Sequence, residues 1–112
     1  MIDSYHFGEI VINGRKYSSD VIIFPDRVQG NWWRSKGHEI CLEDITEIMN
    51  ENPEVLIVGT GHSGLVTVLP QVQQEIEQRD IKLIVEPTHE ACNIYNRLSP
   101  FRRVVAALHL TC

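Results

Sequence analysis

The sequence predicts a single α/β domain, and two observations support this fold class. The first half of the chain carries strand and turn signals, whereas after Pro53 short apolar strands alternate with amphipathic helices. A length of 112 residues suits one domain, so we expect residues 1–112 to form one unit. Strands joined by a helical crossover pair in parallel, and residues 55–58 and 81–85 are therefore expected to form parallel strands of one sheet.

The first half predicts a β-meander from residue 9 to about residue 33. Asn13-Gly14 favours a hairpin turn, because both turn positions need positive φ, and Pro25-Asp26 supplies a second turn. The indoles of Trp32 and Trp33 should point to opposite faces of a strand, so at least one is expected to be exposed. The three strands are expected at Glu9–Ile12, Tyr17–Phe24 and Val28–Trp33.

The second half predicts alternating helices and strands. Two continuous apolar runs, Val55–Val58 and Ile81–Val85, are typical of strands buried on both faces. A last buried strand is expected at Val104–Leu110, with its direction left open. Thr88 is a predicted N-cap, because its hydroxyl can accept a hydrogen bond from the first helical turn. The helices are expected at Leu42–Asn50, at Pro70–Gln78 and from Thr88 onward.

The segment from Glu54 to Gly64 holds the most informative motif. An apolar strand runs directly into Gly59, Gly61 and Gly64, which have the spacing G-x-G-x-x-G, and Glu86 ends the next strand. This order is typical of a dinucleotide-binding unit, in which glycines let the backbone approach a pyrophosphate and an acidic residue binds the ribose. The alternative is a glycine turn that closes the strand and lets a loop pack tightly.

The residues after the glycines argue against a bound dinucleotide. The β-branched run in Leu65–Val68 delays the next helix to Pro70, so the pyrophosphate lacks the close run of N-terminal amides that normally binds it. We therefore expect no cofactor, and no saturable binding of NAD, NADP or FAD.

Composition excludes several classes of function. A formal net charge of −5 argues against a nucleic-acid partner. Residues 1–6 lack the pattern of a signal peptide, and no apolar run approaches the ~18 residues of a membrane span, so a cytosolic protein without a membrane partner is expected. Cys41, Cys92 and Cys112 form no C-x-x-C pair, which favours reduced thiols and predicts no metal site.

A functional pocket is predicted at the carboxyl edge of the parallel strands. The segments 59–64 and 88–96 both leave strands at this edge, and helix N-termini there offer backbone donors to a small polar or anionic guest. His62 and His89 can contribute hydrogen bonds or a proton. No catalytic residue is assigned, because the nucleophile motif G-x-S-x-G is absent and His89 and Cys92 need not be oriented for proton transfer.

Three segments of the chain together resemble the Mth-type domain family: Val58–Gly61, Pro87–Asn96 and Val104–Leu108. The resemblance implies a three-layer α/β fold with a mixed central sheet and a smaller β layer, and no established enzyme activity. The relatives of this family include an adipogenesis-associated protein and a mitochondrial complex I assembly factor. The shared residues of the family match here at Gly59, Thr60, Gly61, Thr88, Ala91, Tyr95 and Asn96.

Taken with the motifs, the resemblance predicts a protein-assembly or small-ligand-binding module without established catalysis. The alternative is a nucleotide- or small-anion-using enzyme that acts through the Gly59–Gly64 loop. The expected partner is a protein or a small polar or anionic ligand, and the oligomeric state is left open. The predicted ligand-binding residues are Gly59, Thr60, Gly61, His62, Ser63, Gly64, Thr88, His89, Tyr95 and Asn96.

Overall fold

A computed structural model describes the whole chain, residues 1–112. The predicted helices are confirmed, with the first one divided into a 3₁₀ turn at Leu42–Ile45 and a short α-helix. The helices are α1 (Thr46–Glu51), α2 (Pro70–Gln78) and α3 (Thr88–Leu98). The strands are β1 (Ile2–His6), β2 (Glu9–Ile12), β3 (Arg15–Tyr17), β4 (Val21–Ile23), β5 (Val28–Gln29), β6 (Glu39–Ile40), β7 (Val55–Gly59), β8 (Thr67–Val68), β9 (Lys82–Glu86) and β10 (Val104–Leu108).

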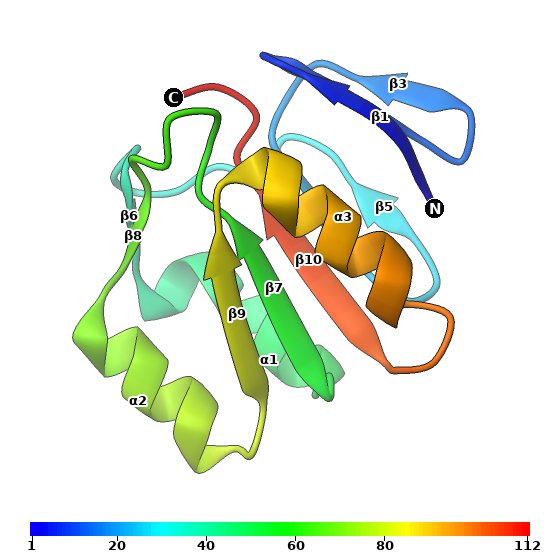
Figure 1. The fold of residues 1–112 in the computed structure, drawn as a ribbon. Coiled ribbons are helices and arrows are strands. Elements are labelled where there is room, and N and C mark those ends of the chain that lie inside the picture. Colours follow the sequence, from blue (N-terminus) through cyan, green and yellow to red (C-terminus); the bar gives the residue numbers. More distant parts are fainter.

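The central sheet is mixed, with the strand order β5-β4-β10-β7-β9 (Figure 1). The predicted parallel pairing is confirmed, because β7 pairs in parallel with β9. The direction of the last strand is now settled: β10 runs parallel to β7 and antiparallel to β4. Gly59 pairs with both Leu108 and Glu86, so the carboxyl ends of the three parallel strands lie at one edge of the sheet.

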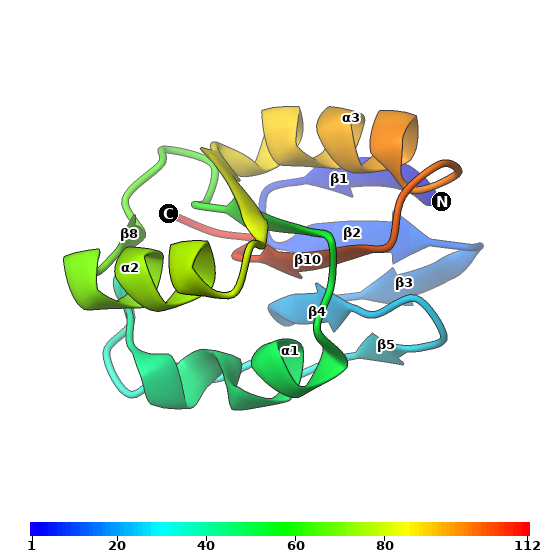
Figure 2. The same ribbon diagram turned by 90° about the horizontal axis from the view of Figure 1, so that it is seen from below.

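The two faces of the central sheet carry different layers, as the family resemblance implies. Along β7, Leu56 and Val58 pack on the face that α1 and α2 cover, together with Ile48 and Ile76. Alternate residues, such as Ile57, pack on the opposite face with α3 and the small N-terminal sheet. Figure 2 shows α3 and α1 on opposite sides of β10. The fold is therefore a three-layer α/β domain. Successive side chains of a buried strand point to opposite faces of the sheet, so each such strand contributes to both hydrophobic cores.

The N-terminal meander lies at different residues from those predicted. It is formed by β1, β2 and β3, with Asn13-Gly14 at the predicted hairpin turn, so it spans residues 2–17 rather than 9–33. The run Tyr17–Phe24 is not one strand, because the chain leaves the small sheet after β3 and enters the central sheet as β4. β4 is buried along its length, and pairing with β10 on one side and β5 on the other satisfies its backbone groups.

Two other strand predictions need correction. β9 is an edge strand with Lys82, Val85 and Glu86 exposed, and it is not buried on both faces as its apolar sequence suggested. β5 ends at Gln29, so the residues up to Trp33 are irregular rather than strand. None of the helices has the length and apolar character that crossing a membrane requires.

Candidate functional site

The glycine loop after β7 lies against the C-terminal segment of the chain. His62 N donates to the carbonyl of Thr111 at 2.6 Å, and Leu65 N donates to the carbonyl of Cys112 at 3.2 Å. Within the loop, Gly64 N donates to the carbonyl of Gly61 at 3.3 Å. These three loop amides, which could otherwise bind a pyrophosphate, therefore already have acceptors within the protein.

Two of the glycines are required by close approaches of the chain to itself. A Cβ atom at Gly59 would lie 2.8 Å from Leu108 Cδ2 and 2.9 Å from Thr88 Oγ1. Gly61 has φ +108°, and a Cβ atom there would lie 2.5 Å from the carbonyl carbon of Cys112. The space beside Gly61 is thus filled by the C-terminal segment, as in the glycine-turn alternative rather than the dinucleotide one.

Thr88 joins three segments at this edge and does not cap its helix, which corrects the N-cap prediction. The N-cap of α3 is Pro87, without a side-chain capping bond. The hydroxyl of buried Thr88 donates to the carbonyl of His109 at 2.5 Å and accepts from Gly61 N at 2.8 Å. Thr60 is likewise buried, and its hydroxyl donates to the carbonyl of Glu86 at 3.2 Å.

The remaining predicted residues divide into two groups. His62, Ser63, Gly64 and His89 are exposed, and the His62 ring meets the edge of the Phe7 ring, with their centroids 5.6 Å apart. The second group lies against β1. Here the Asn96 side chain forms hydrogen bonds of 2.8 Å to both the N–H and the carbonyl of Ile2, and Tyr95 is buried in the core of this face. The structure therefore brings Thr88 to the glycine loop, while Tyr95 and Asn96 fasten α3 to the small sheet.

The three thiols are all free, and Cys92 is unsuited to nucleophilic chemistry. Burial in the core raises the pKa of the Cys92 thiol to about 12, so the reactive thiolate is disfavoured at neutral pH. No group of three or more histidine, cysteine, aspartate or glutamate side chains converges as a metal site would require.

A cluster of charged side chains lies beside the C-terminal segment, and sequence reasoning missed it. The Asp20 cluster consists of Asp20, Arg34 and His109, whose side chains are only 15%, 5% and 9% exposed. Arg34 Nη2 donates to Asp20 Oδ2 at 2.9 Å, His109 Nδ1 lies 2.7 Å from the same oxygen, and Leu110 N donates to Asp20 Oδ1 at 2.8 Å. The Arg34 guanidinium also lies over the Trp32 ring, 4.7 Å from its centroid.

Two groups of the cluster approach the same ring nitrogen of His109. Asp20 Oδ2, an acceptor, lies 2.7 Å from Nδ1, and Arg34 Nη2, a donor, lies 3.0 Å from it, so whether Nδ1 donates or accepts depends on the tautomer. Nε2 lies 3.3 Å from the hydroxyl of Thr111, which can donate or accept there. The cluster therefore holds the imidazole in one orientation.

The cluster lines a surface pocket of about 310 Å³, which we call the Trp33 pocket. Trp32 is buried and Trp33 is 80% exposed, so one indole is exposed as predicted, although these residues are irregular and not a strand. No sequence motif connects residues as far apart as Asp20 and His109. The only indication of the cluster in the sequence was that each of these polar residues lies at one end of an apolar run. The lining residues are Ser18, Ser19, Asp20, Asn31, Trp32, Trp33, Arg34, Gly37, His109 and Thr111.

The closed glycine loop makes the absence of dinucleotide binding testable. We expect calorimetric titration with NAD to give no saturable heat, because the amides of His62 and Leu65 are bonded to the C-terminal segment. Thermal-shift measurements with NADP and FAD serve as a parallel check. Micromolar NAD affinity that is lost in Gly61→Val would overturn this expectation.

Comparison with known proteins agrees with this fold. Over 109 residues the chain is 30% identical to human "NADH dehydrogenase [ubiquinone] 1 alpha subcomplex assembly factor 3", a match that covers 95% of this chain and 58% of that protein. The chain therefore spans little more than half the length of this relative. The structure of a conserved hypothetical protein from Pyrococcus horikoshii OT3 superimposes with a TM-score of 0.88 at 30% identity, covering 100% of this chain and 99% of that chain.

A second solved structure, that of the protein MT938, superimposes with a TM-score of 0.81 at 30% identity and covers 100% of this chain and 98% of that chain. The resemblance drawn from the sequence is thereby confirmed. Residues 2–109 match the model of a family described as a protein of unknown function (DUF498/DUF598), and the chain belongs to this family.

Proposed function

We propose that the protein is an assembly module that binds a partner protein at the carboxyl edge of its central sheet without catalysing a reaction. The observation that carries the proposal is a group of exposed side chains at this edge, the edge patch, which consists of Phe7, His62 and Leu65. Phe7 is 56% exposed and Leu65 is 52% exposed. Apolar and aromatic side chains of this kind provide the anchors of protein interfaces.

The edge patch is held in place by main-chain hydrogen bonds. The residue after Phe7, Gly8, donates from its N–H to the carbonyl of Leu110 at 2.8 Å, while His62 N and Leu65 N donate to the next two carbonyls of the same segment. Two separate loops, the β1–β2 turn and the glycine loop, are thus fastened to the C-terminal segment. Because little ordering is needed on binding, a preorganised surface loses less entropy when a partner docks.

The relatives support a role in assembly, since one of the most similar is named as an assembly factor. The predicted site residues His62, Ser63, Gly64 and His89 are exposed and belong to the surface proposed for the partner. A small polar or anionic ligand is the other candidate for binding to these four residues. The hydrogen bonds that occupy the loop amides count against the alternative of an enzyme that acts through Gly59–Gly64.

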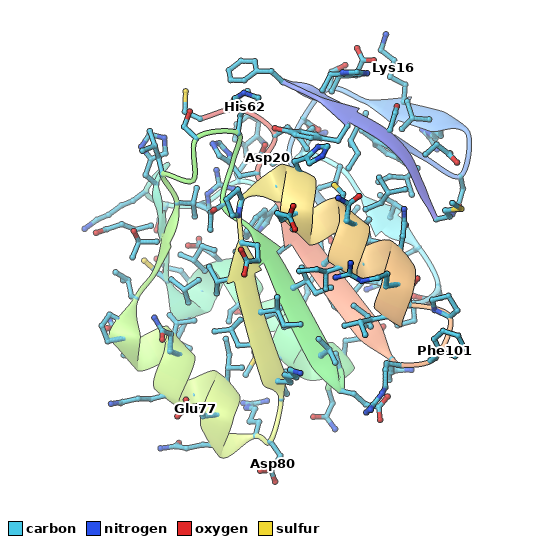
Figure 3. The ribbon with its side chains drawn as sticks, in the orientation of Figure 1. Lys16, Asp20, His62, Glu77, Asp80 and Phe101 are labelled. Carbon is cyan, nitrogen blue, oxygen red and sulfur yellow. The ribbon has the colours of Figure 1, made fainter.

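The test compares capture of partner proteins by the wild-type protein and by Phe7→Ser/Leu65→Ser. The matched control is Phe101→Ser, because Phe101 is 82% exposed in the turn before β10 and lies at the opposite end of the molecule from His62 (Figure 3). We expect a partner captured by the wild type and the control to bind the double variant at least about tenfold more weakly in a direct titration. Equal binding by all three proteins, with unchanged melting curves, would rule out the edge patch.

A further inference from the structure

The Trp33 pocket is separate from the edge patch, because none of the three edge-patch residues lines it. Its volume of about 310 Å³ falls at the lower end of the range of about 300–1,000 Å³ that is usual for small-molecule sites. The Trp33 indole, 80% exposed, is an open aromatic surface at this pocket. The pocket is therefore large enough for a small molecule, and the Trp33 indole gives it one flat side on which a planar molecule can stack.

The lining offers hydrogen-bond donors and acceptors without a net charge. Asp20 and Arg34 are its only ionised side chains, and they pair with each other at 2.9 Å. His109 presents Nε2, which donates or accepts according to the tautomer of the ring. The side-chain amide of Asn31 forms no hydrogen bond within the protein, so its donor and acceptor are both free. A neutral guest that both donates and accepts matches this set better than an ion does.

The Asp20 cluster adds a second reason to assign a function to the pocket. Burying an ion pair is often less favourable than packing apolar side chains of the same shape, because desolvation offsets the attraction between the charges. Arg34 Nη1 is also buried without a hydrogen-bond partner, which is unfavourable in itself. Polar groups that disfavour folding in this way concentrate at functional sites.

We propose that the Trp33 pocket binds a small, neutral, planar molecule that carries an amide-like pair of donor and acceptor. The planar face of the ligand stacks on the exposed Trp33 indole. The ligand forms one hydrogen bond with His109 Nε2 and one with the Asn31 side-chain amide, and its donor and acceptor pair can match either tautomer of the imidazole. Asp20 and Arg34 act by orienting His109 rather than by binding the ligand.

Three probes of one shape and different charge test the proposal: benzamide is neutral, benzoate is an anion and benzamidine is a cation. Titrations are followed by the NMR signal of the Trp33 indole N–H. We expect saturable binding of benzamide that is tighter than that of either charged probe. Tighter binding of benzoate or benzamidine would contradict the proposed ligand class, and no saturable binding of benzamide up to its solubility limit would reject the site.

Two variants locate the binding without disturbing the core. Trp33→Ala removes an exposed ring, and Asn31→Gly removes the amide while allowing the positive φ of +54° at this position. Followed by calorimetry, benzamide is expected to bind each variant at least about tenfold more weakly than it binds the wild type. Phe101→Ala, which removes an exposed ring elsewhere, should bind benzamide as the wild type does. Unchanged affinity in Trp33→Ala would place the binding outside the pocket.

Discussion

Replacing Asp20 with asparagine is expected to lower the free energy of unfolding by about 3–5 kcal/mol, the usual effect of removing one partner of a buried ion pair. The Arg34 guanidinium, with a side chain only 5% exposed, would lose its carboxylate partner and keep its charge in a desolvated position. The 2.7 Å contact between His109 Nδ1 and the carboxylate would be weakened at the same time. Urea unfolding followed by circular dichroism measures the difference.

The matched control for this prediction is Asp26→Asn. Asp26 also pairs with an arginine, Arg27, at 2.8 Å, but its side chain is 72% exposed. Solvent-exposed ion pairs contribute about 0–1 kcal/mol, so this substitution should leave stability nearly unchanged. If the two variants were equally stable, burial of the Asp20 cluster would have no energetic consequence and our account of it would be wrong.

Gly61→Ala is expected to destabilise the protein by about 3–5 kcal/mol through two effects that act together, backbone strain and steric overlap. A φ of +108° is unfavourable for any residue with a side chain, and the added methyl would lie 2.5 Å and 2.6 Å from the carbonyl carbon and oxygen of Cys112. Relief of the overlap requires the C-terminal segment to move away from the loop. Thermal and urea unfolding of the variant give the size of the effect.

Gly14→Ala separates the two effects. Gly14 has φ +80° in the hairpin between β2 and β3, and nothing lies within 4 Å of the place where its Cβ would be. Strain alone, about 1–2 kcal/mol, is therefore expected at this position. A loss of stability in Gly61→Ala no greater than in Gly14→Ala would show that the C-terminal segment does not press on the glycine loop.

The elements that the sequence predicted well are those with local signals. Helix α2 begins at Pro70, a residue favoured at the first helical position, and α3 follows Pro87, so both boundaries could be inferred from the residues themselves. The parallel pairing of β7 and β9 followed from the single helical crossover that connects them. In these cases the information lies within one element or one connection.

The predictions that failed depend on contacts between distant parts of the chain. Tyr17–Phe24 was predicted as one strand but contains the end of β3 and all of β4, and the change of sheet between them is determined by pairing with β2 on one side and β10 on the other. The apolar sequence of β9 gave no sign that it would be an edge strand. The Asp20 cluster was missed for the same reason, because Asp20 and His109 are separated by 89 positions.

The glycine motif was found correctly, whereas its use in the fold was not visible in the sequence. Its spacing permits both a phosphate cradle and a tight turn, and the choice depends on the segment that packs beside Gly61. The ligand-binding role of the predicted residues and the cytosolic location both stay predictions.

The position of β10 has a consequence for how the chain folds. This strand is central in the sheet, and the β4–β5 pair joins the parallel strands only through β10. The pairing of β10 with β4 brings together Val21 and Leu108, which are 87 positions apart (108 − 21). Because contacts of long sequence separation slow folding, we expect refolding to be slower than that of helical proteins of this length. Docking of β10 between β4 and β7 is then the step that couples the two halves of the chain into one cooperative unit.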